Sequence, residues 1–365
     1  FWLKRWRAAV RSAHWPSPMP ASAPPPAAAA APPAGVSAAA GGTGTAGGSP
    51  PAAAVLLRRA GGLTQAVVGG VSLEVAHSDL APSRQGDGAQ AAQGDDDDGA
   101  DAANELWTWF FEEGFSLASA TGFARVWPGA IVLIRALGDP ESVLRLALAQ
   151  AGRQRSRAPL VVELGSGSGL VGLAAAAAAG ADVLLTDTAA VVSGVLAGNL
   201  ERNAGAALAA VSAPGSSAGL PGAVRVGAGS AAAAVLDWTV PVEQQLQGAA
   251  TEPDVVIAAE CIWLAELVEP FAAAASSLLL RPGRPPSAGA DRPVLFLSSR
   301  ERAKDGSATF ARVGAALSAL AARGCGDATL VARFEPGAGT TADEEDEDEE
   351  GPLLVYAIRP DEVKS

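Results

Sequence analysis

Short apolar runs alternate with alanine-rich segments through the C-terminal two thirds of the chain. The runs that predict strands lie near 160–164, 182–186, 223–227, 254–259, 293–299, 327–334 and 352–359. Segments of helical character separate most of them, which predicts an α/β sheet. Only a Gly/Pro-containing and acidic loop joins the last two strands. Such a direct return predicts an antiparallel pair at one edge, because a parallel pair needs a crossover connection.

The hydrophobic pattern is weaker toward the N-terminus. Leu63 to Val75 alternates loosely and predicts a hairpin closing over Gly69 and Gly70, packed at the edge of the main domain. Residues 1–62 are dominated by Ala, Pro, Gly and Ser, and we expect a disordered low-complexity segment there. Residues 63–120 would hold the hairpin and an acidic insertion, and residues 121–360 the main domain. Within that domain, 204–222 and 282–292 read as flexible loops.

Charge is concentrated in two short acidic runs. The chain has 365 residues and a formal charge of −13, to which Asp95 to Asp98 and Asp343 to Glu350 contribute nearly everything. The rest of the chain is therefore close to neutral. We interpret the runs as solvated loops, with attraction of a basic protein substrate as the alternative. Charge alone gives no sign of a nucleic-acid-binding groove.

Cysteine and histidine are too scarce for a zinc cluster or a disulfide framework. The chain has two of each, Cys261 and Cys325 with His14 and His77, and they are far apart in sequence. We expect no metal site. Cys261 falls beside the suspected site but is interpreted as a small buried hydrophobe rather than a nucleophile. No apolar run is long enough to predict a transmembrane span.

The chain opens on Phe1, which we interpret as a fragment or a gene model without its true start. No acidic residue precedes Glu74, and the first fifteen residues are basic, as in an organellar transit peptide. Ordinary low-complexity sequence from a GC-rich genome would look the same. We expect a cytoplasmic protein, with plastid or mitochondrion as the alternative.

A glycine turn follows the first strand of the sheet. Its residues are Gly165, Ser166, Gly167, Ser168 and Gly169, and an alanine-rich helix is predicted after it, over 170–179. Glycines let the backbone approach a ligand closely, and the N-terminus of the helix would face that ligand. The second strand ends at Asp187, whose carboxylate is placed to accept from ribose hydroxyls. A nucleotide-like cofactor is therefore predicted.

The identity of the cofactor depends on Glu163. Gly167 to Gly172 also fits the G-x-G-x-x-G pattern of dinucleotide binders, so NAD is one reading, and a turn without cofactor is another. Glu163 lies two residues before the first glycine. A carboxylate there would repel a pyrophosphate and attract the ammonium and sulfonium groups of S-adenosylmethionine. We therefore favour S-adenosylmethionine.

Three further segments offer chemistry. Trp127 precedes an apolar helix at 131–137 and on local grounds would be a core residue. Asp237 and Trp238 follow the third strand, where the indole could stack on a base, although core packing of the ring is equally open. The fourth strand ends at Ala259 and is followed by the carboxylate of Glu260.

Glu260 and, three residues on, Trp263 would lie where ligands bind an open α/β sheet, at the carboxyl ends of its strands. The alternative is a plain strand-to-helix connection, with Glu260 near the N-terminus of a helix over 264–280.

Together these segments resemble the seven-stranded S-adenosylmethionine-dependent methyltransferases, and among them the lysine methyltransferases of the "methyltransferase 16" group. The resemblance covers about 63–360 without the insertions. It rests on Thr121-Gly122 with Trp127, the run Glu163 to Gly169, Asp187, Leu236-Asp237-Trp238, and Glu260-Cys261-Ile262-Trp263. It implies a Rossmann-like seven-stranded sheet with an antiparallel edge hairpin.

The resemblance also implies roles for particular residues. The S-adenosylmethionine pocket would be lined by Trp127, Glu163, Gly165, Ser166, Gly167, Gly169, Asp187, Asp237, Trp238 and Ala259. Glu260 would hold or orient the target amine. Trp263 stands where the group has Tyr or Phe, which keeps an aromatic wall for a cation but removes the phenol hydroxyl.

The function expected from this resemblance is methyl transfer to a lysine of a protein substrate, by a monomer with no membrane partner. A methyltransferase of small molecules or nucleic acids is an alternative, although Glu260 in place of an Asn-Pro-Pro-Tyr-like motif argues against base amines. A NAD-dependent oxidoreductase or an inactive interaction domain is a third possibility.

Overall fold

The computed structural model describes residues 56–60, 62–77, 126–206, 220–280, 292–301, 311–335 and 351–361. All of them belong to one compact unit, Pro51–Ser365. The acidic runs, the Thr121-Gly122 pair and the N-terminal segment up to residue 55 lie outside the described residues. So do most of the two predicted flexible loops.

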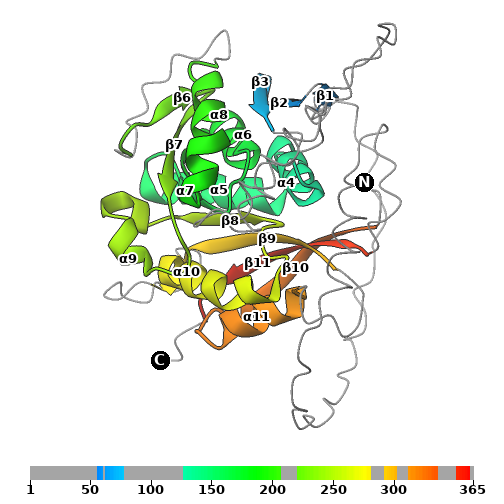
Figure 1. The fold of residues 1–365 in the computed structure, drawn as a ribbon, viewed down its shortest axis with the longest axis vertical. Coiled ribbons are helices and arrows are strands. Elements are labelled where there is room, and N and C mark those ends of the chain that lie inside the picture. Colours follow the sequence, from blue (N-terminus) through cyan, green and yellow to red (C-terminus); the bar gives the residue numbers. More distant parts are fainter. Residues whose placement is uncertain are drawn as a thin grey trace, which may run out of the picture. The chain divides into compact units, whose positions relative to one another are not determined.

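A mixed sheet of eight strands forms the centre of this unit (Figure 1). In spatial order its strands are β10 (Asp327–Phe334), β11 (Leu353–Arg359), β9 (Val294–Arg300), β8 (Val255–Ala259), β4 (Leu160–Leu164), β5 (Asp182–Asp187), β7 (Gly229–Val235) and β6 (Val224–Val226). The five strands from β9 to β7 are parallel. β11 is antiparallel to both β9 and β10, so the predicted antiparallel pair is confirmed.

The sequence pattern predicted one strand where the structure has two. The predicted strand 223–227 corresponds to β6, a short outer strand antiparallel to β7. The strand that pairs in parallel with β5 is β7, whose sequence is Gly-Ser-Ala-Ala-Ala-Ala-Val. Alanine is the best helix former and is depleted in strands, so the local sequence does not indicate a strand here. The sheet therefore has the seven expected strand positions and one additional edge strand.

Helices cover both faces of the sheet (Figure 1). One face carries α4 (Pro128–Gly138), α5 (Val143–Arg155), α6 (Leu170–Ala179) and a continuous helical segment made of α7 (Ala189–Val191), the π-helical turn η1 (Val192–Leu196) and α8 (Ala197–Arg202). The other face carries α9 (Val242–Gln245), α10 (Val268–Leu280) and α11 (Val313–Ala321). Short 3₁₀ turns at Gly248–Thr251 and Ala265–Leu267 lie before β8 and α10.

Successive residues of the central strands belong to two different cores. Val161 and Ile257 pack with α4 and α6, whereas Val162 and Val256 pack with α10. Because side chains alternate along a strand, a strand buried on both faces must be apolar throughout. This explains the continuous apolar runs of the sequence.

A separate sheet of three antiparallel strands lies on the α6 and α8 side. Its strands are β1 (Leu56–Ala60), β2 (Leu63–Val68) and β3 (Val71–Ala76). The predicted hairpin over Gly69 and Gly70 is confirmed, and Leu73 and Val75 enter the core beside α6. The expectation of disorder over 1–62 was wrong for β1, because this strand pairs along its whole length with β2.

Helix α6 approaches its neighbours unusually closely. A Cβ added to Gly227 would lie 2.7 Å from Cα of Ala177, and one added to Gly69 would lie 3.0 Å from Cα of Ala178. The helix side chains here are only methyl groups, so backbone meets backbone. Among the described residues, no helix is long and apolar enough to cross a membrane.

Candidate functional site

The glycine turn between β4 and α6 has a backbone that only glycine adopts easily. Gly165, Gly167 and Gly169 have φ values of +66°, +53° and +81°. The turn is tied to the next strand through Ser166. Its backbone N–H donates to the Thr186 carbonyl at 3.0 Å, and its hydroxyl accepts from the Thr186 N–H at 3.0 Å. Ser166, predicted to line the cofactor pocket, thus holds the turn against β5.

Glu163 lies beneath the N-terminus of α6. Its side chain is buried, and Oε2 accepts from the Gly172 N–H at 3.1 Å. A Cβ at Gly172 would lie only 2.7 Å from that oxygen, so glycine leaves the space that the carboxyl group fills. Burial raises the pKa of Glu163 to about 8, and the nearby Asp187 adds to this effect. The helix terminus that would bind a phosphate in a dinucleotide site is therefore already occupied by an acid.

Asp187 lies on the other side of the turn, at the end of β5. Its Oδ2 accepts from the Gly167 N–H at 2.8 Å and its Oδ1 from the Thr188 N–H at 2.7 Å. Burial raises its pKa, and these two N–H donors and the Thr188 hydroxyl oppose the shift. A carboxylate has about four acceptor positions, so roughly one stays open for a hydroxyl donor.

Glu260 joins the end of β8 to the start of α4. It has φ +53°, a conformation that is uncommon outside glycine. Its Oε2 accepts from the Gly129 N–H at 2.7 Å, and its Oε1 lies 3.5 Å from Nε of Arg300. The side chains of Glu260 and Arg300 are only 2% and 4% exposed, so this is a buried ion pair. Glu260 therefore stabilises the N-terminus of α4. The alternative considered from the sequence placed it at the N-terminus of a helix over 264–280.

The start of α4 is fixed from a second side. The Ser298 hydroxyl donates to the Gly129 carbonyl at 3.0 Å. A Cβ at Gly129 would lie 2.8 Å from Cβ of Glu260, so a larger residue has no room. Trp127 is the residue immediately before this helix and is half-buried. Trp127 and Glu260 therefore both lie at the N-terminus of α4, Trp127 as the residue before the helix and Glu260 as the acceptor for the Gly129 N–H.

Trp238 lies against the glycine turn. Its Cζ2 would be 3.3 Å from a Cβ on Gly165, and its ring meets Phe271 edge-on, with centroids 5.4 Å apart. The indole Nε1 is buried and has no hydrogen-bond partner among the described residues. The ring thus borders both the turn and the second core.

Cys261 is the other neighbour of Gly165. Its Cβ would be 2.7 Å from a Cβ on that glycine. Burial raises the pKa of the thiol, and Asp187, Glu163 and Glu260 raise it further. Cys261 stays protonated at neutral pH, which agrees with its interpretation as a small hydrophobe.

The remaining predicted residues have more local surroundings. Asp237 is exposed, and its Oδ1 accepts from the backbone and hydroxyl of Thr239 at 2.8 and 2.7 Å, which makes a turn within its own loop. Ala259 and Trp263 are half-buried near the end of β8. The Trp263 carbonyl accepts from the Ala311 N–H at 2.9 Å. Ala259 thus lies at the strand end as expected, whereas the Asp237 carboxylate is engaged by Thr239.

Sequence reasoning missed several residues that build the site, namely Gly129, Asn199, Ser298 and Arg300. Gly129 and Asn199 interrupt apolar stretches, which was the available signal. Nothing local marks Ser298 or Arg300, because their partners come from distant segments.

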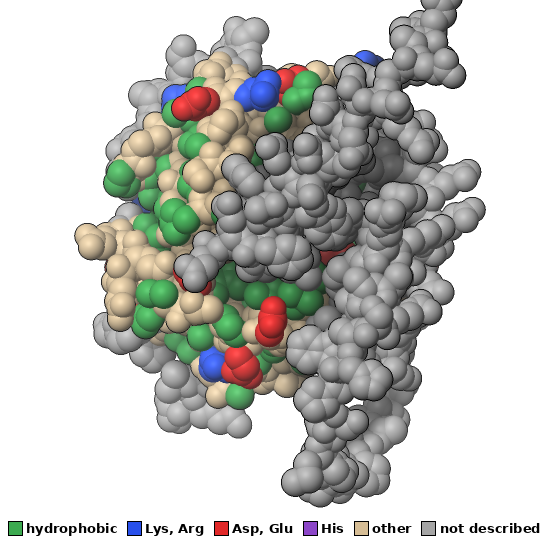
Figure 2. All heavy atoms as spheres, viewed as in Figure 1, with side chains coloured by type: hydrophobic (Ala, Val, Ile, Leu, Met, Phe, Trp, Pro, Cys, Tyr) green, Lys and Arg blue, Asp and Glu red, His purple; other side chains and the backbone are tan. Residues whose placement is uncertain are grey.

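On the face in Figure 2, acidic and basic side chains of the described residues lie near one another at the upper and lower ends. The described part of the chain contains no group of three His, Cys, Asp or Glu side chains able to hold a metal.

Residues 115–214 match a family model described as lysine methyltransferase. The matched segment contains Glu163, the whole glycine turn and Asp187. The resemblance drawn from the sequence is thereby confirmed, as is the mixed α/β fold.

Solved structures similar to this chain include several methyltransferases. The mitomycin 7-O-methyltransferase MmcR is 14% identical with a TM-score of 0.34, and the match covers 71% of this chain and 62% of that one. The S-adenosylmethionine-dependent methyltransferase SibL is 12% identical with a TM-score of 0.31, covering 72% and 77%. A putative sarcosine dimethylglycine methyltransferase from Galdieria sulphuraria is 12% identical with a TM-score of 0.32, covering 61% and 88%. The chain spans 41% of a further match, EvdMO1, at 15% identity and a TM-score of 0.31, covering 59% of this chain.

Proposed function

We propose, from the lysine methyltransferase family that residues 115–214 match, that this chain is an S-adenosylmethionine-dependent methyltransferase acting on a lysine side chain of a protein. The observation that carries the proposal is that the matched segment holds both carboxyl groups, Glu163 and Asp187, on the two sides of one glycine turn.

The cofactor part of the proposal follows from the donors and acceptors around the turn. When bound, S-adenosylmethionine would supply an activated methyl group for in-line displacement by a neutral amine, with S-adenosylhomocysteine as the product. Asp187 has an acceptor position left for a hydroxyl of a ribose. The ring of Trp238, whose indole N–H has no partner among the described residues, lies against Gly165 of the same turn.

Glu163 favours a cation over a phosphate at the turn. Its raised pKa means that the carboxyl group is largely neutral at pH 7 in the free protein. A positive group nearby would lower that pKa and favour the carboxylate, so a cation would be bound with release of a proton. A pyrophosphate would instead keep the acid uncharged, and it would find the Gly172 N–H at the helix N-terminus already used by Glu163.

The acceptor side of the site is proposed to involve Trp263, Trp127 and Glu260. An aromatic wall can bind a lysine side chain through cation–π contact before the amine loses its proton. Glu260 is our predicted orienting residue. Its ion pair with Arg300 favours action through the position of α4 and Trp127 over direct contact with the amine.

These residues need not form any covalent bond. Holding the two reactants in line and excluding water can supply roughly 7–11 kcal/mol in favourable cases. The described site has no histidine beside it, so we propose that the amine proton leaves to water.

The first test is calorimetric titration of the full chain with S-adenosylhomocysteine and, in parallel, with NAD. Binding of the former alone supports the proposal, whereas binding of NAD alone contradicts it. The Asp187→Asn variant is the control for binding at this turn.

The second test is transfer of radiolabelled methyl from S-adenosylmethionine to proteins of a cell extract, followed by hydrolysis and identification of the labelled amino acid. Label in methyllysine supports the full proposal. Label found only in nucleic acid or small molecules would contradict the lysine acceptor and retain the methyltransferase.

A further inference from the structure

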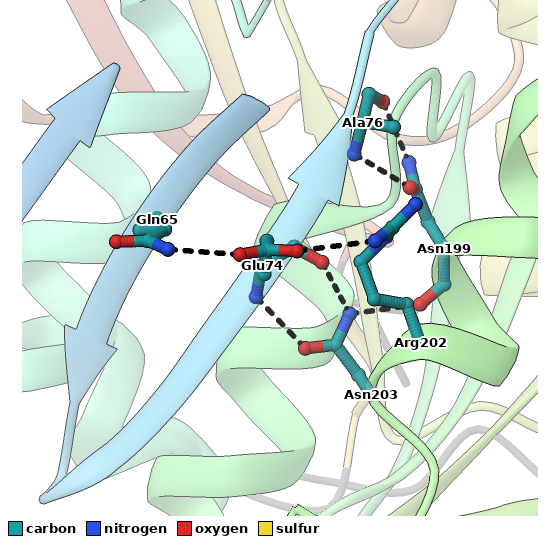
Figure 3. A network of polar contacts seen from close by, with 6 residues as sticks. All are labelled: Gln65, Glu74, Ala76, Asn199, Arg202 and Asn203. Atoms are coloured by element: carbon teal, nitrogen blue, oxygen red, sulfur yellow. Dashed lines mark hydrogen bonds and ion pairs between the residues drawn. The ribbon is translucent and has the colours of Figure 1, made fainter. Parts of the chain in front are cut away.

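Asn199 on α8 contacts both the glycine turn and the small sheet. Its side chain is buried, and Nδ2 donates to the Ser168 carbonyl of the turn at 2.9 Å. The same amide pairs with Ala76 at the end of β3, accepting from its N–H at 2.7 Å and donating to its carbonyl at 2.9 Å (Figure 3). One side chain therefore connects two segments that are about ninety residues apart in sequence.

Asn203 makes the same kind of contact with the small sheet one helical turn later, and its Nδ2 also donates to the Asn199 carbonyl at 2.8 Å, so it does not reach the glycine turn. Its Oδ1 accepts from the Glu74 N–H at 2.9 Å, and its Nδ2 donates to the Glu74 carbonyl at 2.6 Å (Figure 3). Arg202 adds an ion pair with the Glu74 carboxylate at 3.1 Å. The two asparagines thus satisfy the outer edge of β3 in the way that a neighbouring strand would.

The π-helical turn η1 precedes these asparagines in the chain. The Ala197 N–H donates to the Val192 carbonyl, five residues back, which inserts an extra residue into the helix. Leu196 then lies beneath Gly169, with its Cδ1 2.6 Å from where a Cβ would be, and Asn199 reaches Ser168. Without the extra residue, the side chains of α8 would be rotated by about 100° relative to α7.

We propose that Asn199 is a positioning residue of the cofactor site, which couples docking of β3 to the conformation of the glycine turn. This inference rests on the proposed function. Ser168 lies between two glycines with positive φ, in the part of the turn with the greatest backbone freedom. A buried hydrogen bond to its carbonyl fixes that peptide before any ligand arrives, so the small sheet becomes part of the cofactor-binding machinery.

The coupling is reciprocal. If docking of β3 favours the binding-competent turn, a ligand on the turn must stabilise the docking of β3 to the same extent. The backbone N–H groups of Glu74 and Ala76 donate to the side chains of Asn203 and Asn199, so the rate at which these amides exchange hydrogen reports the docking of β3 directly.

The test compares Asn199→Ala with Asn203→Ala in the full chain. Both variants lose two side-chain bonds to β3 and one further bond. In Asn199→Ala the further bond is the one to the Ser168 carbonyl of the turn, whereas in Asn203→Ala it is the one to the Asn199 carbonyl within the helix. We expect Asn199→Ala to weaken S-adenosylhomocysteine binding roughly tenfold, as for loss of a buried hydrogen bond, and Asn203→Ala to change it by less than about twofold. Equal affinities in all three proteins would overturn the inference, and so would equal weakening in both variants, which would indicate a merely structural role.

Hydrogen exchange of the wild-type chain supplies a test that needs no variant. S-adenosylhomocysteine should slow exchange of the Glu74 and Ala76 amides more than that of amides in β10, at the far edge of the main sheet. No difference between the two groups in a chain that binds the ligand would overturn the coupling alone. Failure of the wild-type chain to bind at all would overturn the proposed function, and the positioning role with it.

Discussion

The replacement Glu163→Gln should change how the stability of the protein depends on pH. Gln has the same shape, and its carbonyl can still accept from the Gly172 N–H. In the folded chain the Glu163 pKa is about 8, against an ordinary value of 4.5. Between these values the folded state holds a proton that the unfolded state has lost, so stability falls as the pH rises through this window. The stability that comes from the raised pKa of Glu163 is fully present below pH 4.5 and is lost as the pH rises past 8.

The expected size follows from the linkage of one proton. Raising the pH from about 5.5 to about 7.5 should lower the free energy of unfolding by about 2.5 kcal/mol more in the wild type than in Glu163→Gln. Other groups titrate in both proteins and cancel in the comparison, apart from the coupling to Asp187. Urea unfolding at several pH values, followed by circular dichroism, measures this difference.

Parallel pH profiles for the two proteins would refute the reasoning, because they would mean that Glu163 ionises as freely in the folded chain as in the unfolded one. A steeper decline in the variant would contradict it as well.

Three further predictions concern other parts of the structure. Asp187→Asn should weaken S-adenosylhomocysteine binding by about 1–3 kcal/mol because the amide nitrogen replaces an acceptor oxygen, and unchanged affinity in calorimetry would remove Asp187 from the ligand. Glu260→Ala should destabilise the chain by about 3–5 kcal/mol because it leaves the Arg300 charge buried, and adding Arg300→Met should recover part of that loss in thermal unfolding. Gly129→Ala should destabilise the folded chain, because the added Cβ would clash with Glu260. Gly198→Ala should instead stabilise it by about 0.5–1 kcal/mol, because this helical position has nothing within 4 Å of an added Cβ. Equal changes in melting temperature for the two variants would count against the packing argument.

Much of the fold could be predicted because burial on both faces leaves a clear sequence signature. β4, β5, β8, β9 and β11 are mostly apolar runs bounded by turn residues. β7 lacks that signature, since its four alanines carry no preference for a strand. It is a strand because α6 and β5 bury it, and this information is not local.

The candidate site was predictable to the extent that its residues follow strand ends. Glu163, Asp187 and Glu260 lie where parallel strands terminate, and strand ends meet at one edge of the sheet. What each carboxyl group touches could not be predicted. Arg300, which pairs with Glu260, belongs to a strand forty residues away, and its contact depends on the strand order of the folded sheet.

The close packing of α6 has a consequence for how sequence can vary in this protein. Its C-terminal half meets Gly69 and Gly227 mainly with backbone atoms and the methyl group of Ala178, and backbone cannot change rotamer to make room for an added atom. A larger residue at Ala177 or Ala178 would have to displace the small sheet or β7 as a whole. A substitution on this one buried helix would then shift whole strands. The sequence of the small sheet would therefore evolve together with that of α6 rather than independently of it.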